Sequence, residues 1–158
     1  MAAEMTDDEL RTSVLGLLDA HTVLSLATLH RGGAHAASLM YARDGYTLYW
    51  LSSTGSRHSQ ALAEQPRVTA TVAGQFTDFR EIRGLQLSGT ASLVSVADES
   101  RQAMEHLAAR YPFLALFQSG VGRLAQRLAD SAVYRLTPAA ITLIDNTRGF
   151  GFKQTLRP

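Results

Sequence analysis

The sequence contains no cysteine. This absence excludes disulfide bonds, thiolate zinc sites, iron–sulfur clusters and a thiol nucleophile. A chain without disulfides fits a reducing compartment, and we therefore expect a cytoplasmic location. The histidines follow no metal-ligand spacing such as His-Glu-x-x-His, so no metal site is expected either.

Lysine is almost absent, since Lys153 is the only one, and the formal net charge is only +1. The chain therefore lacks the broad positive field with which proteins attract nucleic acid or an anionic membrane, and neither partner is expected. Any phosphate site must be built from arginine, backbone amides, hydroxyl groups or histidine.

Long apolar runs are missing as well. No stretch approaches the roughly 20 residues that cross a bilayer. The acidic residues 1–10 also lack the order of a signal peptide, in which a basic region precedes an apolar one. A length of 158 residues, 46% of them hydrophobic, suits one sizeable core. We expect residues 1–158 to form a single domain.

The sequence does contain a helix signal followed by a series of short strand patterns. Thr6 and Glu9 have the spacing of a capping box and predict a helix over residues 6–20. Ser95 and Asp98 repeat that spacing and predict the start of inserted helices over residues 96–129, the last of which is expected from about Val121 to Ala129. Strand patterns cover residues 22–95 and 133–145. Because few helices separate these strands, we predict a mainly β fold in which a six-stranded antiparallel sheet closes into a barrel with short flanking helices.

The strand pattern over residues 46–53 is apolar or aromatic on both faces. Tyr46, Leu48 and Trp50 point to one side, whereas Tyr49 and Leu51 point to the other. This pattern predicts a strand that is covered on both sides.

The segment that follows this strand has the features of an anion site. The chain turns at a glycine and then begins a helix, whose first amide groups carry partial positive charge. Ser56, Arg57 and His58 can each donate a hydrogen bond to a phosphate, and the hydroxyl groups of Ser52 and Ser53 lie at the end of the strand. The alternative is an ordinary capped helix with two solvated side chains.

Residues 46–74 resemble the pyridoxamine 5'-phosphate oxidase-like family of FMN-binding split barrels. In that family a strand runs into a Thr/Ser turn, a Ser-Arg-Lys motif opens a short helix, and Asn/Gln-Pro-Arg follows. Here these motifs read Ser56-Arg57-His58 and Gln65-Pro66-Arg67. Residues 82–89 resemble a family strand that ends in glycine. Residues 145–151 are similar to the C-terminus of a short, uncharacterised bacterial branch of the family.

This resemblance implies an FMN-binding split barrel that forms a homodimer with two FMN sites at the interface. The flavin ring would lie against residues 37–41 and 51–53, held largely by backbone groups, with Arg57 and His58 at the phosphate. The residues expected at the cofactor are Ser38, Leu39, Met40, Leu51, Ser52, Ser53, Ser56, Arg57, His58 and Gln86.

Three departures from the family pattern argue against true pyridoxamine 5'-phosphate oxidase activity. His58 replaces the phosphate-binding lysine, residues 35–40 lack the family's arginine, and Gly84 stands where the family has a glutamine at the flavin. Gln86 lies two residues later on the same side of the strand, and it is the expected substitute for that glutamine.

The resemblance implies a flavin-dependent oxidoreductase that acts on an unidentified small molecule, with FMN supplying the redox chemistry. No catalytic side chain can be assigned from the sequence. The alternatives on the same fold are a non-catalytic FMN carrier or sensor, a deazaflavin (F420) protein, and a haem protein with His30, His35 or His58 as axial ligand. Phe150 and Phe152 are expected to cover the barrel end, a partner subunit or the flavin.

Overall fold

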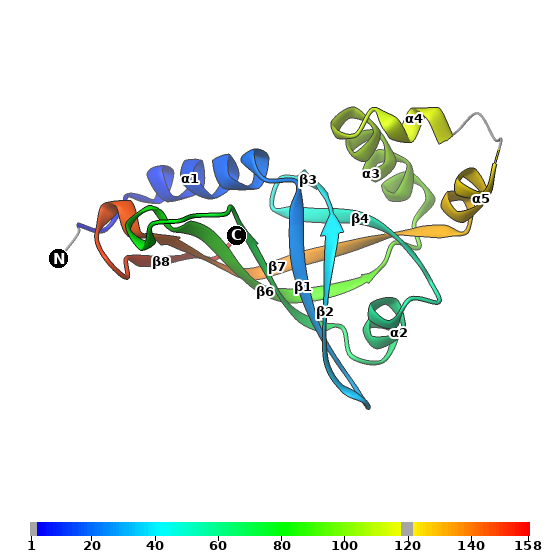
Figure 1. Cartoon of the computed structure of the whole chain (residues 1–158), viewed down its shortest axis with the longest axis horizontal. Coiled ribbons are helices and arrows are strands. Elements are labelled where there is room, and N and C mark those ends of the chain that lie inside the picture. The colour runs from blue at the N-terminus through cyan, green and yellow to red at the C-terminus, as the bar shows by residue number, and fades with distance from the viewer. Residues whose placement is uncertain (1–2, 118–121) are drawn as a thin grey trace.

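The computed structural model describes residues 3–117 and 122–158 (Figure 1). Within these residues the helices are α1 (Asp7–Ala20), α2 (Arg57–Glu64), α3 (Ala97–Arg110), α4 (Phe113–Phe117) and α5 (Arg123–Ala129), with short 3-10 turns η1 (Phe79–Glu81) and η2 (Asn146–Arg148). The strands are β1 (Val23–His30), β2 (Gly33–Met40), β3 (Ala42–Asp44), β4 (Thr47–Ser53), β5 (Arg67–Ala73), β6 (Arg83–Leu93), β7 (Ser131–Asp145) and β8 (Lys153–Leu156). Among these described helices, none has the length and apolar character needed to cross a membrane.

All strands join one antiparallel sheet. Their order is β2-β1-β5-β6-β7-β4-β3, and β8 pairs with β7. The sheet curls, so that β2 at one edge approaches β4 next to the other edge without forming ladder hydrogen bonds to it (Figure 1). The predicted mainly β split barrel is therefore confirmed, and the barrel is open between β2 and β4.

The sheet has eight strands in the described residues, not the six that were predicted. One extra strand is β3. It is separate from β2 because the strand is interrupted at Tyr41, whose N–H donates to the carbonyl of Thr22. The other is β8, a four-residue strand at the C-terminus. Strands this short carry too few residues for an alternating pattern to reveal them.

A β-bulge allows β7 to continue through a proline. Ser88 of β6 pairs with Ala140, but the next residue, Gly89, pairs with Pro138, so β7 has one extra residue at this point. Proline has no N–H to donate, and a bulge is one of the few strand positions that tolerates it. The two backbones come so close here that a Cβ on Gly89 would lie 2.2 Å from the Thr137 carbonyl oxygen.

The capping box of α1 is confirmed. The Thr6 hydroxyl accepts a hydrogen bond from the Glu9 N–H at 3.3 Å, and the Glu9 carboxylate accepts one from the Thr6 N–H at 2.8 Å. Both bonds satisfy backbone donors that a helix start leaves unpaired. The apolar side of α1 packs into the main core of the barrel.

The second predicted capping box is wrong. The N-cap of α3 is Val96, which makes no side-chain cap hydrogen bond. Because the helix begins one residue later than the motif requires, Ser95 lies before the cap and Asp98 occupies the second helical position. The inserted helices over residues 96–129 are α3, α4 and α5, and the predicted start of the last one at residue 121 lies outside the described residues.

Strand β4 is covered on both faces, as predicted. Leu48 and Trp50 are fully buried in the main core, where the Trp50 ring stacks on Tyr134 with centroids 6.0 Å apart. On the other face, Tyr49 and Leu51 pack beneath the inserted helices in two smaller apolar clusters. Residues 52 and 53 then carry the strand to α2.

Two glycine substitutions are expected to have opposite effects on stability. Gly89→Ala should destabilise the protein by roughly 1–3 kcal/mol, because the added methyl group meets rigid backbone at the bulge. Gly16→Ala should stabilise it by about 0.5–1 kcal/mol, because Gly16 lies inside α1 with open space around it. Urea unfolding of both variants checks this, and a Gly89→Ala protein as stable as the wild type would contradict the bulge geometry.

Candidate functional site

The strand, turn and helix predicted around Ser56 are present. β4 ends at Ser53, whose carbonyl accepts a hydrogen bond from the Ser56 N–H at 3.1 Å, and α2 begins at Arg57. Ser56 is the N-cap, and its hydroxyl accepts a hydrogen bond from the Ser59 N–H at 3.3 Å. In the described part of the chain, the N–H groups of Arg57 and His58 make no hydrogen bond outside the helix. Two donors at the positive end of α2 are therefore available to an anion.

Three side chains converge beside these amides. Nε2 of His58 lies 2.6 Å from the Ser52 hydroxyl and 3.1 Å from the Ser56 hydroxyl, and the two hydroxyl oxygens are 3.3 Å apart. The Ser56 hydroxyl also donates to the hydroxyl of Ser59, which is buried, at 2.8 Å. We call Ser52, Ser56, His58 and Ser59 the hydroxyl–imidazole cluster. It fixes the His58 ring at the start of α2.

The surroundings of this cluster favour the neutral form of its histidine. Partial burial lowers the pKa of His58 below its ordinary value, and the nearby His35 lowers this pKa further. The two rings are stacked with centroids 6.4 Å apart and planes inclined by 5°. His35 comes from β2, so β2 and α2 meet at this ring pair.

Arg57 extends from the same helix end toward the β1–β2 turn. The side chain is exposed, and a Cβ on Gly32 in that turn would lie 3.8 Å from its Nη2 atom. His30 and Arg31 each lie 3.2 Å from the carboxylate of Glu64, at the far end of α2. Arg57 has no such partner among the described carboxylates, so its positive charge is available to a ligand.

The other predicted site residues are spread over several surfaces. In β2, Ser38 and Met40 point outward and are exposed, whereas Leu39 packs against the main core. Ser53 is exposed at the end of β4, and its hydroxyl accepts a hydrogen bond from the Gly55 N–H. Leu51 directs its side chain to the opposite face of β4 from Ser52.

Gln86 is not part of the hydroxyl–imidazole cluster within one chain. It lies on the outward face of β6, in a groove that also contains Thr71 and Ser88. Of the predicted residues, the structure thus brings together Ser52, Ser56 and His58 and places Arg57 next to them.

Two residues at the site, Ser59 and His35, were not predicted from the sequence to lie beside His58. Ser59 is three residues after the N-cap, which is the position from which a backbone N–H reaches a capping side chain. His35 is close to His58 only because the β1–β2 hairpin folds over α2. No local sequence signal marks that approach.

The tail formed by residues 145–152 covers the end of the barrel next to the start of α1, away from α2 (Figure 1). Phe152 packs against the main core beneath the Arg148 guanidinium, 5.3 Å from the ring centroid. Phe150 contacts Phe79 edge to face at 5.5 Å but is 84% exposed. Within one chain, the tail therefore caps the barrel and does not close over the hydroxyl–imidazole cluster.

Comparison with known proteins agrees with this architecture. A family model described as pyridoxamine 5'-phosphate oxidase matches residues 10–145. A UPF0306 protein from Haemophilus ducreyi is 36% identical over 88 residues, which cover 54% of this chain and 60% of that protein. A UPF0306 protein from Klebsiella pneumoniae is 31% identical over 117 residues, which cover 74% of this chain and 71% of that protein.

Among solved structures, a heme binding protein from Mycobacterium smegmatis has the same fold. The TM-score is 0.73 at 18% sequence identity, with 98% of this chain and 59% of that chain covered. The fold and the two sequence relatives lead to one assignment. The chain belongs to the pyridoxamine 5'-phosphate oxidase-like family of split barrels, on the bacterial branch that includes the UPF0306 proteins.

Proposed function

We propose that this protein binds FMN, with the phosphate at the start of α2. The observation that carries the proposal is the coincidence of two unused amide donors, the unpaired Arg57 guanidinium and the hydroxyl–imidazole cluster at one helix end. A phosphate monoester offers the acceptor oxygens and the negative charge that these groups match. The membership of the family supports a flavin as the rest of the ligand.

The flavin ring is proposed to lie where β2 approaches β4, at the opening of the barrel. Backbone groups of Ser38, Leu39 and Met40 would line one side, and those of Leu51, Ser52 and Ser53 the other. Gln86 is too far along the sheet to join them in the same chain. It is proposed to reach the flavin of a second copy, because it shares the outward face of the sheet with Ser38 and Met40.

The proposed activity is that of a flavin-dependent oxidoreductase with a small-molecule substrate. Bound FMN supplies the hydride chemistry, while the chain anchors the phosphate and orients the ring. A non-catalytic carrier or sensor has the same site, and anaerobic reduction separates the two functions. Rapid bleaching of the flavin spectrum by NADH or NADPH would support the enzyme, and a flavin that neither nucleotide reduces would favour the carrier.

Haem binding is the second candidate, because a solved relative is a heme binding protein and His35 and His58 lie side by side. However, Nε2 of His58 is within hydrogen-bonding distance of two serines, so axial ligation would require those contacts to break. A deazaflavin also carries a phosphate that could occupy the same helix end. The absorption spectrum of the purified protein distinguishes a flavin, a deazaflavin and the Soret band of haem.

Arg57→Ala is expected to weaken FMN binding at least tenfold, about 1.4 kcal/mol, because a charge-assisted contact to the phosphate is lost. The measurement is a titration of apo-protein with FMN, followed by quenching of flavin fluorescence. Arg31→Ala is the matched control, since this exposed arginine pairs with Glu64 and is not assigned to the phosphate. FMN affinity that is unchanged in Arg57→Ala would show that the phosphate site has been misplaced.

The stability of the ligand-free protein is expected to fall as the pH drops below about 6.5, the usual histidine value. The folded-state pKa of His58 is lowered, so the unfolded chain takes up the proton more readily and acid favours unfolding. Urea unfolding at pH 7.5 and 5.5 should show a smaller loss in His58→Gln than in wild type. FMN should reduce the wild-type loss, because a phosphate favours the protonated ring. His106→Gln is the control, and an identical pH response in all three proteins would contradict the assignment.

A homodimer is proposed on the basis of the open outward face of the sheet. The exposed side chains on this face are almost entirely small or uncharged, and they extend from β2 across β1 and β5 to β6: Ala34, Ala36, Ser38, Met40, Val23, Ser25, Ala27, Leu29, Thr69, Thr71, Gln86 and Ser88. Arg67, at the start of β5, is also exposed on this face. A largely uncharged surface of this extent is typical of a protein interface.

The Ala27→Arg variant tests the dimer. Ala27 lies between Ala36 of β2 and Thr69 of β5, so a guanidinium there would be buried without a partner in the interface. We expect wild type to have twice the chain mass of 17.1 kDa by light scattering, and Ala27→Arg to have the chain mass itself. Ala109→Arg on the exposed side of α3 should remain dimeric. A monomeric wild-type protein would refute the interface.

A further inference from the structure

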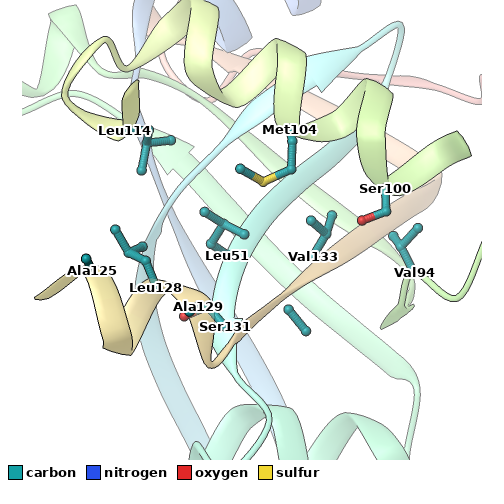
Figure 2. A pocket seen from close by; sticks show the side chains of 11 residues that line it. Leu51, Val94, Ser100, Met104, Leu114, Ala125, Leu128, Ala129, Ser131 and Val133 are labelled. Carbon is teal, nitrogen blue, oxygen red and sulfur yellow. The ribbon is translucent and has the colours of Figure 1, made fainter. Parts of the chain in front are cut away.

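A cavity lies on the other side of β4 from the hydroxyl–imidazole cluster (Figure 2). Its floor is formed by β4 and β7, and its walls are formed by α3, α4 and α5. The volume is about 510 Å³, which falls in the range of small-molecule sites. The lining residues are Leu51, Val94, Ser100, Met104, Leu114, Ala125, Leu128, Ala129, Ser131, Ala132 and Val133.

The cavity exists because the inserted helices pack on the sheet at two separate places. One apolar cluster joins Tyr111 and Leu114 to Ala42, and the other joins Ala103 to Val94 and Val133. Among the residues that the structure describes, only Leu51 and Met104 contact both clusters. The residues of α5 that face the space between the clusters include two alanines. Protein interiors are normally close-packed, and a cavity of this size lowers stability if nothing fills it.

The described residues that line the cavity include no charged side chain. Of its two hydroxyl groups, that of Ser131 already donates to the Arg127 carbonyl at 2.9 Å. The Ser100 hydroxyl points toward Val133 from the side of Val94 (Figure 2). Within the described residues this hydroxyl has no hydrogen-bond partner in the structure. The cavity therefore offers apolar walls and one free hydrogen-bonding group.

Glu99, which precedes Ser100 in the sequence, is not among the described residues that line the cavity. Its carboxylate accepts hydrogen bonds from the Tyr49 hydroxyl at 3.1 Å and from the Arg135 guanidinium at 2.5 Å. Because Arg135 is paired in this way, it offers no free positive charge to an anionic ligand. The described lining therefore favours a neutral ligand over an anionic one.

We propose that this cavity is a binding site for a neutral, mostly apolar small molecule that hydrogen-bonds to Ser100. The site is distinct from the proposed FMN site, because Leu51 and Ser52 are consecutive residues that point to opposite faces of β4. The proposal does not rest on FMN binding, and each site can be removed without the other.

The test uses N-phenylnaphthylamine, an uncharged probe that fluoresces in apolar surroundings, titrated into the full-length wild-type protein. We expect saturable binding at one site. Ala125→Phe and Ser100→Phe fill the cavity from two different helices and should weaken binding at least tenfold. Gln126→Phe and Gln102→Phe place the same side chain on the exposed sides of those helices and should bind as wild type.

Two further measurements complete the test. Arg57→Ala should bind the probe normally even though it binds FMN more weakly, which keeps the two proposals separable. Anilinonaphthalene sulfonate, an anionic probe of similar size, should bind more weakly than the neutral one. The proposal is overturned if both cavity-filling variants, shown to be folded by circular dichroism, bind the neutral probe like wild type, or if the anionic probe binds more tightly.

Discussion

Strand β4 contributes side chains to the main core, to the apolar cavity and to the hydroxyl–imidazole cluster. Because successive side chains of a strand point to opposite faces, the cavity lies on one side of β4 and the other two lie on the opposite side. Trp50 belongs to the main core, Leu51 lies under the inserted helices, and Ser52 returns to the first side to meet His58. The register is fixed by antiparallel pairing with β7 from Leu48 to Ser53. A slip of one residue would bury the serine under the helices and remove the partner of the imidazole, so pairing with β7 positions both the candidate cofactor site and the apolar cavity.

Features that depend on neighbours in sequence were the most predictable part of the fold. The α1 cap needs only Thr6 and Glu9, and both bonds are present. The same spacing failed at Ser95, because α3 begins at Ala97 with Val96 as its N-cap, one residue later than the motif requires. The bulge opposite Gly89 and the pairing of β8 depend on residues about 50 and 13 positions apart, and no local pattern encodes such pairings.

The same distinction holds at the candidate site. Ser56, Arg57 and His58 were predictable because a strand end, a turn and a helix start follow one another directly in the sequence. The approach of His35 was not, because it requires the β1–β2 hairpin to fold back along α2. Gln86 was predicted as the substitute for the glutamine that the family has at the position of Gly84. Within one chain it lies on another strand from the cluster, so its place at the cofactor stays a prediction that depends on a second copy.

Histidine in place of lysine would change the charge of the proposed phosphate site. A lysine ammonium is charged whether or not a ligand is present, whereas burial and His35 favour the neutral form of His58 in the ligand-free protein. The serines at 2.6 and 3.1 Å hold the ring without requiring that it be charged. A phosphate at this helix end would favour the imidazolium, so ligand binding and proton uptake would be coupled. Arg57 then supplies the permanent charge, and His58 makes the strength of the site depend on pH in a range where lysine would not.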